Sequence, residues 1–148
     1  MSSEAATALD AIRRSAHGGA VPPTRLPQPG PVTNLGRLVQ PADATENGTL
    51  FGGEAMRLMD EAAAVAAIRH ARGSVVTAHV DAIDFHEPVP VGTFVEASAR
   101  VVEVGRTSMV VEVVLEAEDR RTAARTVTTT GRFVMVAVDD RGRPRPLG

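Results

Sequence analysis

The chain has 148 residues, which fits one domain, and 43% of them are hydrophobic, which is enough to form a core. Its formal net charge of -2 gives no electrostatic reason to expect a nucleic acid or an anionic membrane as the main partner. The sequence contains no cysteine, which excludes disulfides, thiolate metal sites and cysteine nucleophiles, and no apolar run approaches the length of a membrane span. We therefore expect a soluble globular protein, and a cytoplasmic location is compatible with this composition.

The N-terminal segment 1–31 is predicted to form a mobile extension. Its residues are small, polar or proline for the most part, and they contain no continuous apolar segment that could serve as a secretory signal. Residues 4–16 can form a short amphipathic helix with Leu9 and Ile12, which the glycines and prolines after it would end. A mitochondrial transit peptide is the weaker alternative, because two acidic residues interrupt the acid-poor pattern of such peptides.

A strand, a loop and a long helix follow the extension. Residues 35–40 are predicted to form the first strand, and the polar loop PADATENGT then leads to the pair Gly52-Gly53. A long helix is expected from this pair to a stop at Gly73. An acidic residue in its first turn and basic residues in its last turn suit the helix dipole.

Four segments of β type complete the chain, at residues 75–85, 94–104, 107–118 and about 123–138. The third alternates apolar and polar residues, and turn residues separate it from its neighbours. The links between the strands are short, which favours an antiparallel sheet, and the single long helix has the right length to be wrapped by that sheet. The sequence therefore predicts an α+β fold.

The start of the long helix carries the most informative residues. Gly52 and Gly53 let backbone approach a ligand closely, and the first amides of a helix have no partners within it, so an oxygen that gathers negative charge would be stabilised there. Asp60 follows two turns later, beside an apolar stripe, and is expected to be at least partly buried. The stripe consists of Met56, Met59, Ala63, Ala66 and Ala67.

Two plainer interpretations of these residues stay open. Arg57 lies three residues before Asp60 and four before Glu61, so the acids can be ordinary surface partners of this arginine. The two glycines can be no more than a loop before a helix.

Four separated segments resemble successive signatures of one family, the hotdog-fold acyl-CoA thioesterases of the cytosolic acyl-CoA hydrolase type. They are NGTLFGGEAMRLMDEAAAVAAIRHA, VVTAHVDAIDFHEPVPVG, VGRTSM and FVMVAVDDRGRPRP, in the order of the family. The resemblance runs from about Val32 to the C-terminus. It therefore implies a hotdog thioesterase domain over residues 32–148, with an antiparallel sheet around one long central helix, and it leaves residues 1–31 outside.

The resemblance gives the start of the helix a chemical role. The Gly53 amide is expected to polarise the carbonyl of an acyl-CoA thioester, while Asp60 acts as general base on water or attacks the carbonyl itself to give an anhydride. The products would be a free fatty or organic acid and CoA. We expect no separate cofactor, because CoA enters as part of the substrate.

The loop before the helix departs from the family pattern. Enzymes of this type commonly carry an asparagine three residues before the glycine that corresponds to Gly48, and this chain has Thr45 there. Asn47 is an alternative helper that could orient the water or the thioester. A non-catalytic acyl-CoA binding or sensing module therefore remains the alternative function, while hydratase or dehydratase chemistry ranks last because no histidine lies in a motif of that kind.

Other polar segments are candidates for ligand contacts. By resemblance, Arg106, Thr107 and Ser108 of VGRTSM would lie beside the phosphopantetheine arm of CoA, and the plain alternative is that they only close a hairpin. The C-terminal arginines are interpreted as a solvated tail rather than as phosphate ligands. No metal site is expected, because strand alternation sends Asp81 and Asp84 to opposite faces.

The resemblance also implies a site shared between subunits, in which the loop and the start of the helix of one copy face Asp60 of another. The minimal unit would be a homodimer, since a lone hotdog domain leaves a sheet edge open. Related enzymes often form trimers of dimers, so a hexamer is expected. Neither a nucleic acid nor a membrane is expected as a partner.

Overall fold

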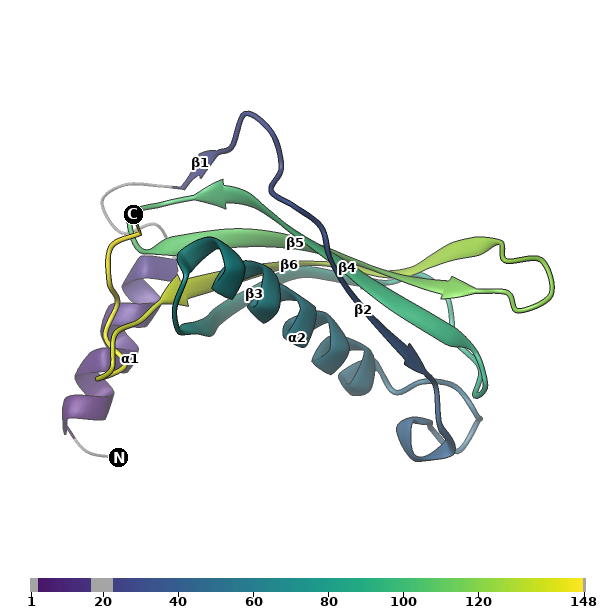
Figure 1. Cartoon of the computed structure of the whole chain (residues 1–148). Coiled ribbons are helices and arrows are strands. Elements are labelled where there is room, and N and C mark those ends of the chain that lie inside the picture. Colours follow the sequence, from purple (N-terminus) through teal and green to yellow (C-terminus); the bar gives the residue numbers. More distant parts are fainter. Residues whose placement is uncertain (1–2, 17–22, 148) are drawn as a thin grey trace.

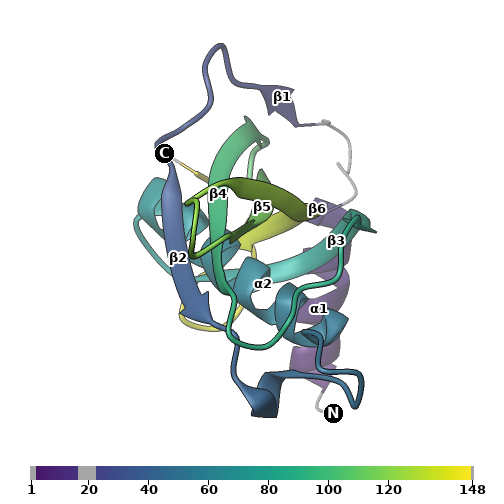
Figure 2. The same ribbon diagram turned by 90° about the vertical axis from the view of Figure 1, so that its right-hand side faces the viewer.

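The computed structural model describes residues 3–16 and 23–147. One long helix lies along a strongly curved antiparallel sheet (Figures 1 and 2). No helix in these residues is long and apolar enough to cross a membrane. The elements follow in this order: α1 Ser3–Ala16, β1 Thr24–Arg25, β2 Thr33–Leu38, the 3-10 turn η1 Pro41–Asp43, α2 Gly52–Ala71, β3 Val75–Phe85, β4 Phe94–Val104, β5 Ser108–Glu118 and β6 Arg125–Ala137.

The strands of the sheet are ordered β1-β4-β5-β6-β3, and β2 also pairs with β4. All the pairings are antiparallel. The strand β3 therefore forms one edge of the sheet within the chain. This arrangement confirms the predicted α+β hotdog fold, with the sheet wrapped around α2.

The main core lies between α2 and the concave face of the sheet. Small alanines on the helix allow it to pack closely, and the largest buried side chains of this core include Phe133, Met59 and Leu115. The predicted apolar stripe is largely right, although Met56 is only partly buried. The residues of α2 that are buried are Ala55, Leu58, Met59, Ala62, Ala63, Ala66 and Ala67.

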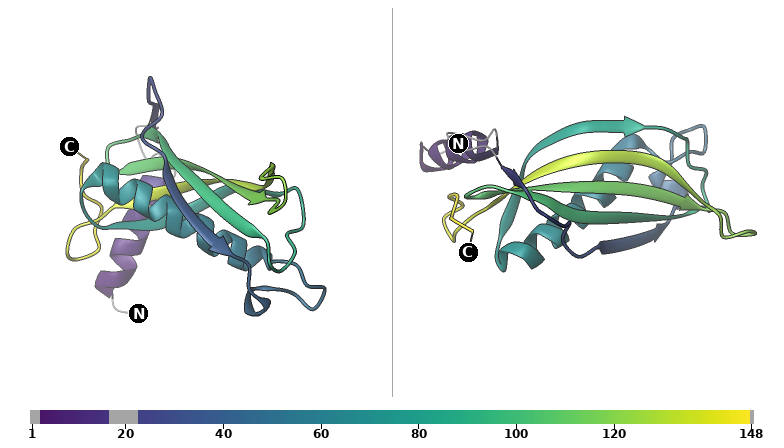
Figure 3. Two further views of the ribbon diagram at one scale, coloured as in Figure 1. Left: turned by 45° about the vertical axis from the view of Figure 1, so that its right-hand side comes forward. Right: turned by 90° about the horizontal axis from the view of Figure 1, so that it is seen from above.

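A second, smaller apolar cluster lies on the opposite face of the sheet. Valines of β4, β5 and β6 form it, among them Val102, Val110 and Val136, and Ile12 of α1 packs against them. Helix α1 contacts β3 and β6, and Figure 3 shows it at the same end of the sheet as the C-terminal segment. The N-terminal extension thus contains the short helix that the sequence allowed, and its predicted end lies outside the described residues.

The mobility expected of residues 1–31 remains a prediction, and so does the domain boundary near Val32. Within this segment β1 pairs with β4, with Thr24 opposite Val104. The extension therefore contributes one helix and one short strand to the described fold.

The first long strand begins and ends two residues earlier than the sequence indicated, at Thr33–Leu38 instead of residues 35–40. The reason is the turn that follows it. The backbone N–H of Gln40 donates a hydrogen bond to Oδ2 of Asp43 at 2.9 Å, and Pro41 opens a 3-10 helix there. The chain must leave the sheet to form this turn.

The end of α2 also differs from the prediction. The left-handed residue that stops the helix is Arg72, with φ of 56°, rather than Gly73. A Cβ atom at Gly73 would lie 2.6 Å from Nη2 of Arg145, so the glycine leaves room for that guanidinium. Arg145 in turn donates a hydrogen bond to the carbonyl of Ala71 at 2.8 Å. The interpretation of the C-terminal arginines as a solvated tail is therefore wrong for Arg145, which caps the helix.

Candidate functional site

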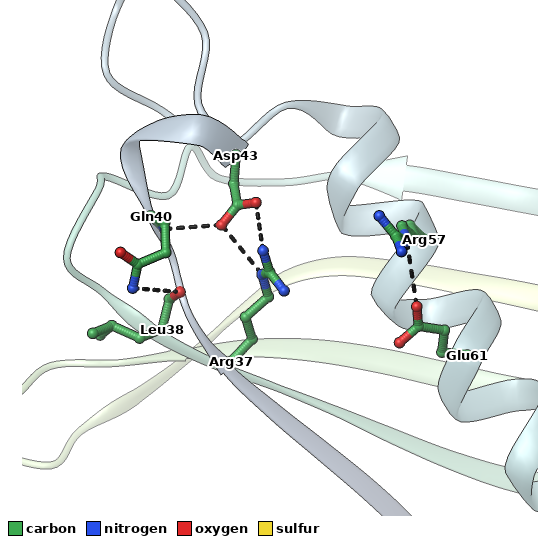
Figure 4. Close-up of polar contacts among 6 residues, drawn as sticks. All are labelled: Arg37, Leu38, Gln40, Asp43, Arg57 and Glu61. Carbon is green, nitrogen blue, oxygen red and sulfur yellow. Dashed lines mark hydrogen bonds and ion pairs between the residues drawn. The ribbon is translucent and has the colours of Figure 1, made fainter.

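An ion pair anchors the loop that leads to α2. Arg37 donates hydrogen bonds from Nη2 to Oδ1 of Asp43 at 2.6 Å and from Nε to Oδ2 at 3.2 Å (Figure 4). The Arg37 guanidinium, helped by the Gln40 amide, holds the pKa of the Asp43 carboxyl below its ordinary value. The carbonyl of Asp43 accepts the N–H of Phe51 at 3.0 Å, which positions the start of the helix. Sequence reasoning missed this pair, although an acid three residues after Gln40 matches a capping pattern.

The next part of the loop is closed by its own threonines. The hydroxyls of Thr45 and Thr49 lie 3.2 Å apart, and Oγ1 of Thr45 accepts the backbone N–H of Asn47 at 3.2 Å. Gly48 adopts a φ of 77°, which favours glycine at this turn. The Thr45 hydroxyl is therefore used inside the loop, and the Asn47 side chain is exposed.

The two glycines at the start of α2 have different surroundings. The N-cap residue Phe51 makes no side-chain capping bond, and the first internal bond of the helix runs from Ala55 N to Phe51 O at 3.0 Å, so the earlier amides lack partners within it. A Cβ atom at Gly52 would lie 3.2 Å from the ring of Phe85, whereas one at Gly53 would meet nothing within 4 Å. Gly52 is thus packed against the protein itself, whereas Gly53 is exposed and has open space on the side where a side chain would lie.

Asp60 points to the sheet rather than to the neighbouring arginine. The hydroxyl of Thr77 on β3 donates a hydrogen bond to Oδ1 of Asp60 at 2.6 Å. Arg57 instead pairs with Glu61 at 3.3 Å (Figure 4), so the surface-partner interpretation is right for Glu61 and wrong for Asp60. Asp60 is partly buried, as expected. Sequence reasoning did not find Thr77, because no local pattern links a threonine of a strand to an acid on the preceding helix.

Within one chain, these residues form two separate groups. Thr45, Asn47 and Gly53 lie at the start of α2, and Asp60 and Thr77 lie farther along it. Gly53 and Asp60 belong to one continuous helix, and their spacing in the sequence places them about 10 Å apart along its axis. One carbonyl group cannot contact both within a single chain.

A cavity of about 310 Å³ adjoins the start of the helix. Gly52 and Phe85 line it, together with His86, Glu87 and Thr129. The ring Nε2 of His86 lies 3.1 Å from the hydroxyl of Thr130, so this histidine has a partner on β6. The cavity places an apolar ring and polar groups next to the unpaired amides.

The acids and histidines of β3 do not gather into a cluster. In the described ranges 3–16 and 23–147, no three His, Asp or Glu side chains come together in a way that could hold a metal ion. The pairing of β3 with β6 shifts register between Asp81 and Asp84, where Ala82 adopts a φ of 52°. Strict alternation is therefore interrupted at this point of the strand.

The VGRTSM segment forms the hairpin between β4 and β5. The amide of Gly105 donates to the carbonyl of Ser108 at 2.8 Å, and the carbonyl of Arg106 accepts the N–H of Leu147 at 2.8 Å. Ser108 is 3% exposed, whereas the side chain of Arg106 is exposed. Arg106 is thus open to a ligand in this chain, Thr107 is partly buried, and the Ser108 hydroxyl is not accessible.

The family of this chain follows from the comparison with protein-family models. The model described as the thioesterase superfamily matches residues 47–124, which is more than half of the chain. The chain belongs to the thioesterase superfamily. The matched range contains Asn47, Gly53, Asp60 and Thr77, and Thr45 lies just outside it.

Individual relatives agree with this family. The cytosolic acyl coenzyme A thioester hydrolase of Mus musculus is 34% identical over 137 residues, which cover 88% of this chain and 36% of that protein. The chain thus spans 36% of the length of the curated relatives from mouse and rat. These matches confirm the resemblance on which the sequence interpretation depends.

Solved structures match the fold at similar identity. A hexameric thioesterase from Yersinia pestis is 38% identical, with a TM-score of 0.75 over 83% of this chain and 98% of that chain. An acyl-CoA hydrolase from Staphylococcus aureus, with an asparagine replaced by alanine and coenzyme A bound, is 34% identical, with a TM-score of 0.76 over 78% of this chain and 70% of that one. Two other structures of the S. aureus enzyme carry alanine in place of a threonine or an aspartate.

Proposed function

We propose that this protein hydrolyses acyl-CoA thioesters to a free fatty or organic acid and CoA. The observation that carries the proposal is the hydrogen bond from Thr77 to the partly buried carboxylate of Asp60, in a chain of the thioesterase superfamily. A carboxylate that is fixed through one oxygen keeps its second oxygen for a water molecule or a carbonyl carbon.

The spacing of the replaced residues in the S. aureus enzyme supports this assignment. There the replaced asparagine precedes the replaced aspartate by the same interval in the sequence as Thr45 precedes Asp60 in this chain. The replaced threonine follows that aspartate by the same interval as Thr77 follows Asp60. The pair Asp60 and Thr77 thus has the same residue types at the same separation, and only the asparagine position differs.

The proposed site needs two copies of the chain. Gly53 and Asp60 are about 10 Å apart along one helix, so the Gly53 amide of one subunit would act with Asp60 of another. Thr77, the partner of Asp60, is a residue of β3. The outer edge of β3 is unpaired within the described chain and can accept a strand from a second copy. We therefore propose a homodimer, and further assembly into a hexamer, the state named for the Y. pestis thioesterase.

The proposed reaction begins with the thioester carbonyl at the start of α2. The Gly53 N–H stabilises the negative charge that develops on the carbonyl oxygen. Asp60 takes a proton from water, the water oxygen bonds to the carbonyl carbon, and the carbon–sulfur bond breaks to release CoA. In the alternative route Asp60 bonds to the carbonyl carbon itself, the carbon–sulfur bond breaks to release CoA, and water then opens the mixed anhydride that has formed. Both routes use the bond from Thr77 to fix Oδ1.

The remaining contacts of the substrate are assigned more generally. Arg106 is proposed to meet a phosphate of CoA, because its side chain is exposed on the β4–β5 hairpin. Thr107 and the backbone of Ser108 would lie beside the pantetheine arm. CoA enters as part of the substrate, and the proposal assigns no other cofactor.

A cytoplasmic location is part of the proposal. The mouse relative is named a cytosolic enzyme, and a chain without cysteine is compatible with a reducing compartment.

The test is a thiol-release assay with a panel of acyl-CoA lengths. Because the chain has no cysteine, a thiol reagent reports only the CoA that is released. The Asp60→Asn variant is expected to lose between about 100-fold and 10,000-fold in turnover while it still binds acyl-CoA. Glu61→Gln is the matched control, because Glu61 is the adjacent acid and pairs with Arg57 on the surface. Equal turnover in both variants would refute the role of Asp60.

A second candidate function is supported by the loop. Thr45 replaces the family asparagine, and its hydroxyl already bonds within the loop, so it is not free to orient water. The chain would then bind or sense acyl-CoA without efficient hydrolysis. Binding of acyl-CoA without thiol release from any member of the panel would favour this function. A large gain of turnover in Thr45→Asn would identify Thr45 as the cause, and an unchanged Asn47→Ala would remove Asn47 from the site.

A further inference from the structure

The space at the start of α2 contains a polar group that the proposed reaction does not use. We call this space the helix-start cavity, and its volume is about 310 Å³. It lies between the first turn of α2, residues 86–89 after β3, and Thr129 of β6. Most of its inner wall is apolar, so the hydroxyl of Thr129 decides what kind of group can be bound there.

The hydroxyl of Thr129 is available to a ligand. Thr129 is 2% exposed, yet its side chain forms no hydrogen bond with any residue of the described ranges. Every fully enclosed side-chain oxygen or nitrogen in those ranges has a partner. The Thr129 oxygen is therefore not enclosed, and the small exposed part of this residue includes Oγ1, which faces the cavity that the residue lines. A buried polar group of this kind requires a partner from outside the chain.

The neighbouring threonines differ from Thr129 in this respect. The hydroxyl of Thr128 donates a hydrogen bond to the carbonyl of Leu115 at 3.1 Å. The hydroxyl of Thr130 lies 3.1 Å from Nε2 of His86. Of these three consecutive hydroxyl groups, only the one that faces the helix-start cavity is left without a partner in the protein.

A β-bulge in β6 sets the direction of this side chain. Thr128 is an extra residue in the pairing of β6 with β5, next to the pair formed by Thr129 and Leu115. The carbonyl of Thr128 accepts the N–H of His86 at 2.8 Å, which ties the wall of the cavity to the bulge. Bulges re-aim neighbouring side chains and are frequent beside active sites. The position of Thr129 is therefore fixed by the backbone around it.

Phe85 connects Thr129 with the start of α2. The two residues lie opposite one another in the pairing of β3 with β6, so their side chains share one face of the sheet. The ring of Phe85 in turn lies 3.2 Å from the place of a Cβ atom at Gly52. Gly52 and Thr129 thus both adjoin one aromatic side chain. An acyl group whose carbonyl is held at the Gly53 amide would therefore reach the Thr129 hydroxyl within a few bonds.

The size and charge of the cavity restrict the acyl group further. A cavity of about 150 Å³ holds a benzene molecule, so about twice that volume holds roughly a dozen carbon and oxygen atoms. Ala55 and Val89, both buried, close it on the inside. Glu87 is exposed at its rim and forms no ion pair with a described residue, so its charge repels a second carboxylate. The lining therefore suits a short and neutral group.

We propose that the helix-start cavity selects short, neutral acyl groups with a hydroxyl or keto oxygen near the thioester, and that Thr129 recognises this oxygen. A threonine hydroxyl can donate to a keto oxygen and can accept from a hydroxyl. A saturated chain of the same length would remove water from Thr129 and leave its hydroxyl unpaired, which disfavours that substrate. The inference rests on the proposed function, because it places the thioester carbonyl at Gly53.

The experiment compares kcat/KM for 3-hydroxybutyryl-CoA and butyryl-CoA in the thiol-release assay. The wild type should prefer the hydroxylated substrate by about tenfold or more. Thr129→Val removes only a hydroxyl that has no partner in the protein, so it should fold, and its ratio of the two kcat/KM values should approach one. Thr129→Ser should keep the preference, and Thr126→Val, at an exposed threonine of the same strand, should not change it.

Isothermal titration separates this inference from the proposed function. Both thioesters are titrated into Asp60→Asn and into the double variant Asp60→Asn with Thr129→Val. If the wild type releases no thiol, the proposed function fails, but tighter binding of 3-hydroxybutyryl-CoA that disappears in the double variant would still support the selection by Thr129. Equal kcat/KM for both substrates in the wild type, or an equal loss for both in Thr129→Val, would overturn the inference and leave the hydrolytic function in place.

Discussion

The hydrogen bond from Thr77 to Asp60 gives the sharpest prediction. Thr77→Val removes the hydroxyl with little change of shape, and the free energy of unfolding should fall by no more than the about 1.5 to 3 kcal/mol that a hydrogen bond to a charged group contributes, so the variant should still fold. The bond is short, at 2.6 Å, and its acceptor is a carboxylate. The bond holds the carboxylate of Asp60 in place, and a misplaced reacting group can lose up to about 100-fold in rate, so turnover of acyl-CoA should fall between about 10-fold and 100-fold.

The thiol-release assay, run as kcat and KM for each variant, separates positioning from folding. A residue that positions Asp60 for the chemical step should lower kcat and leave KM almost unchanged. Thr77→Ser retains a hydroxyl and should recover most of the lost rate, while Thr126→Val, a change at another exposed strand threonine, should have no effect. A fully active Thr77→Val, or a Thr77→Ser as impaired as Thr77→Val, would refute the reasoning.

The other predictions concern stability and are measured by urea unfolding. Arg145→Ala should lower the free energy of unfolding by about 1 to 2 kcal/mol, because Ala71 loses its charged donor, while Arg143→Ala, at an exposed neighbour, should change it by less than about 0.5 kcal/mol. Gly73→Ala should displace the same guanidinium, so its effect on the free energy of unfolding should not add to that of Arg145→Ala in the double variant. Full additivity of the two changes would contradict the role of Arg145 as the cap of α2. Asp43→Asn should destabilise the fold at pH 7. Because Arg37 lowers the pKa of Asp43, the stabilisation by this carboxylate is present above the ordinary aspartate pKa of about 4 and is lost as the pH falls through the pKa of the folded state. The difference in the free energy of unfolding between the wild type and Asp43→Asn should therefore become smaller in acid. A difference that stays constant from pH 7 to pH 3 would exclude the ion pair as its source.

Local patterns were sufficient for the strands of the sheet. The bounds of β3 and β4 agree with the segments predicted from the sequence, because turn residues flank both and their residues have the composition of strands. The end of α2 could be predicted less well from local patterns. Gly73 looked like the residue that stops the helix, yet its lack of a side chain serves a contact with Arg145, which lies near the far end of the chain. A single sequence contains no sign of such a contact.

The same distinction separates the residues of the candidate site. Asp60 and Gly53 could be singled out because helix periodicity and unpaired helix amides are local properties. Thr77, in contrast, is one of many threonines in the strands, and only its place opposite Asp60 in the folded chain sets it apart. The bond of the Thr45 hydroxyl within its own loop was likewise visible only in three dimensions.

The C-terminal segment connects two parts of the chain that the sequence presents as independent. The N–H of Leu147 bonds to the carbonyl of Arg106 in the β4–β5 hairpin, and Arg145 binds the end of α2, so one short segment holds both. The hairpin alone would leave Arg106 at the tip of a two-stranded turn, where side chains are free to move. Because the segment ties this turn to the helix, the position of Arg106 depends on the same contacts that end α2. The loss of Arg145 should therefore lower the stability of the fold and also weaken the binding of any ligand that contacts Arg106.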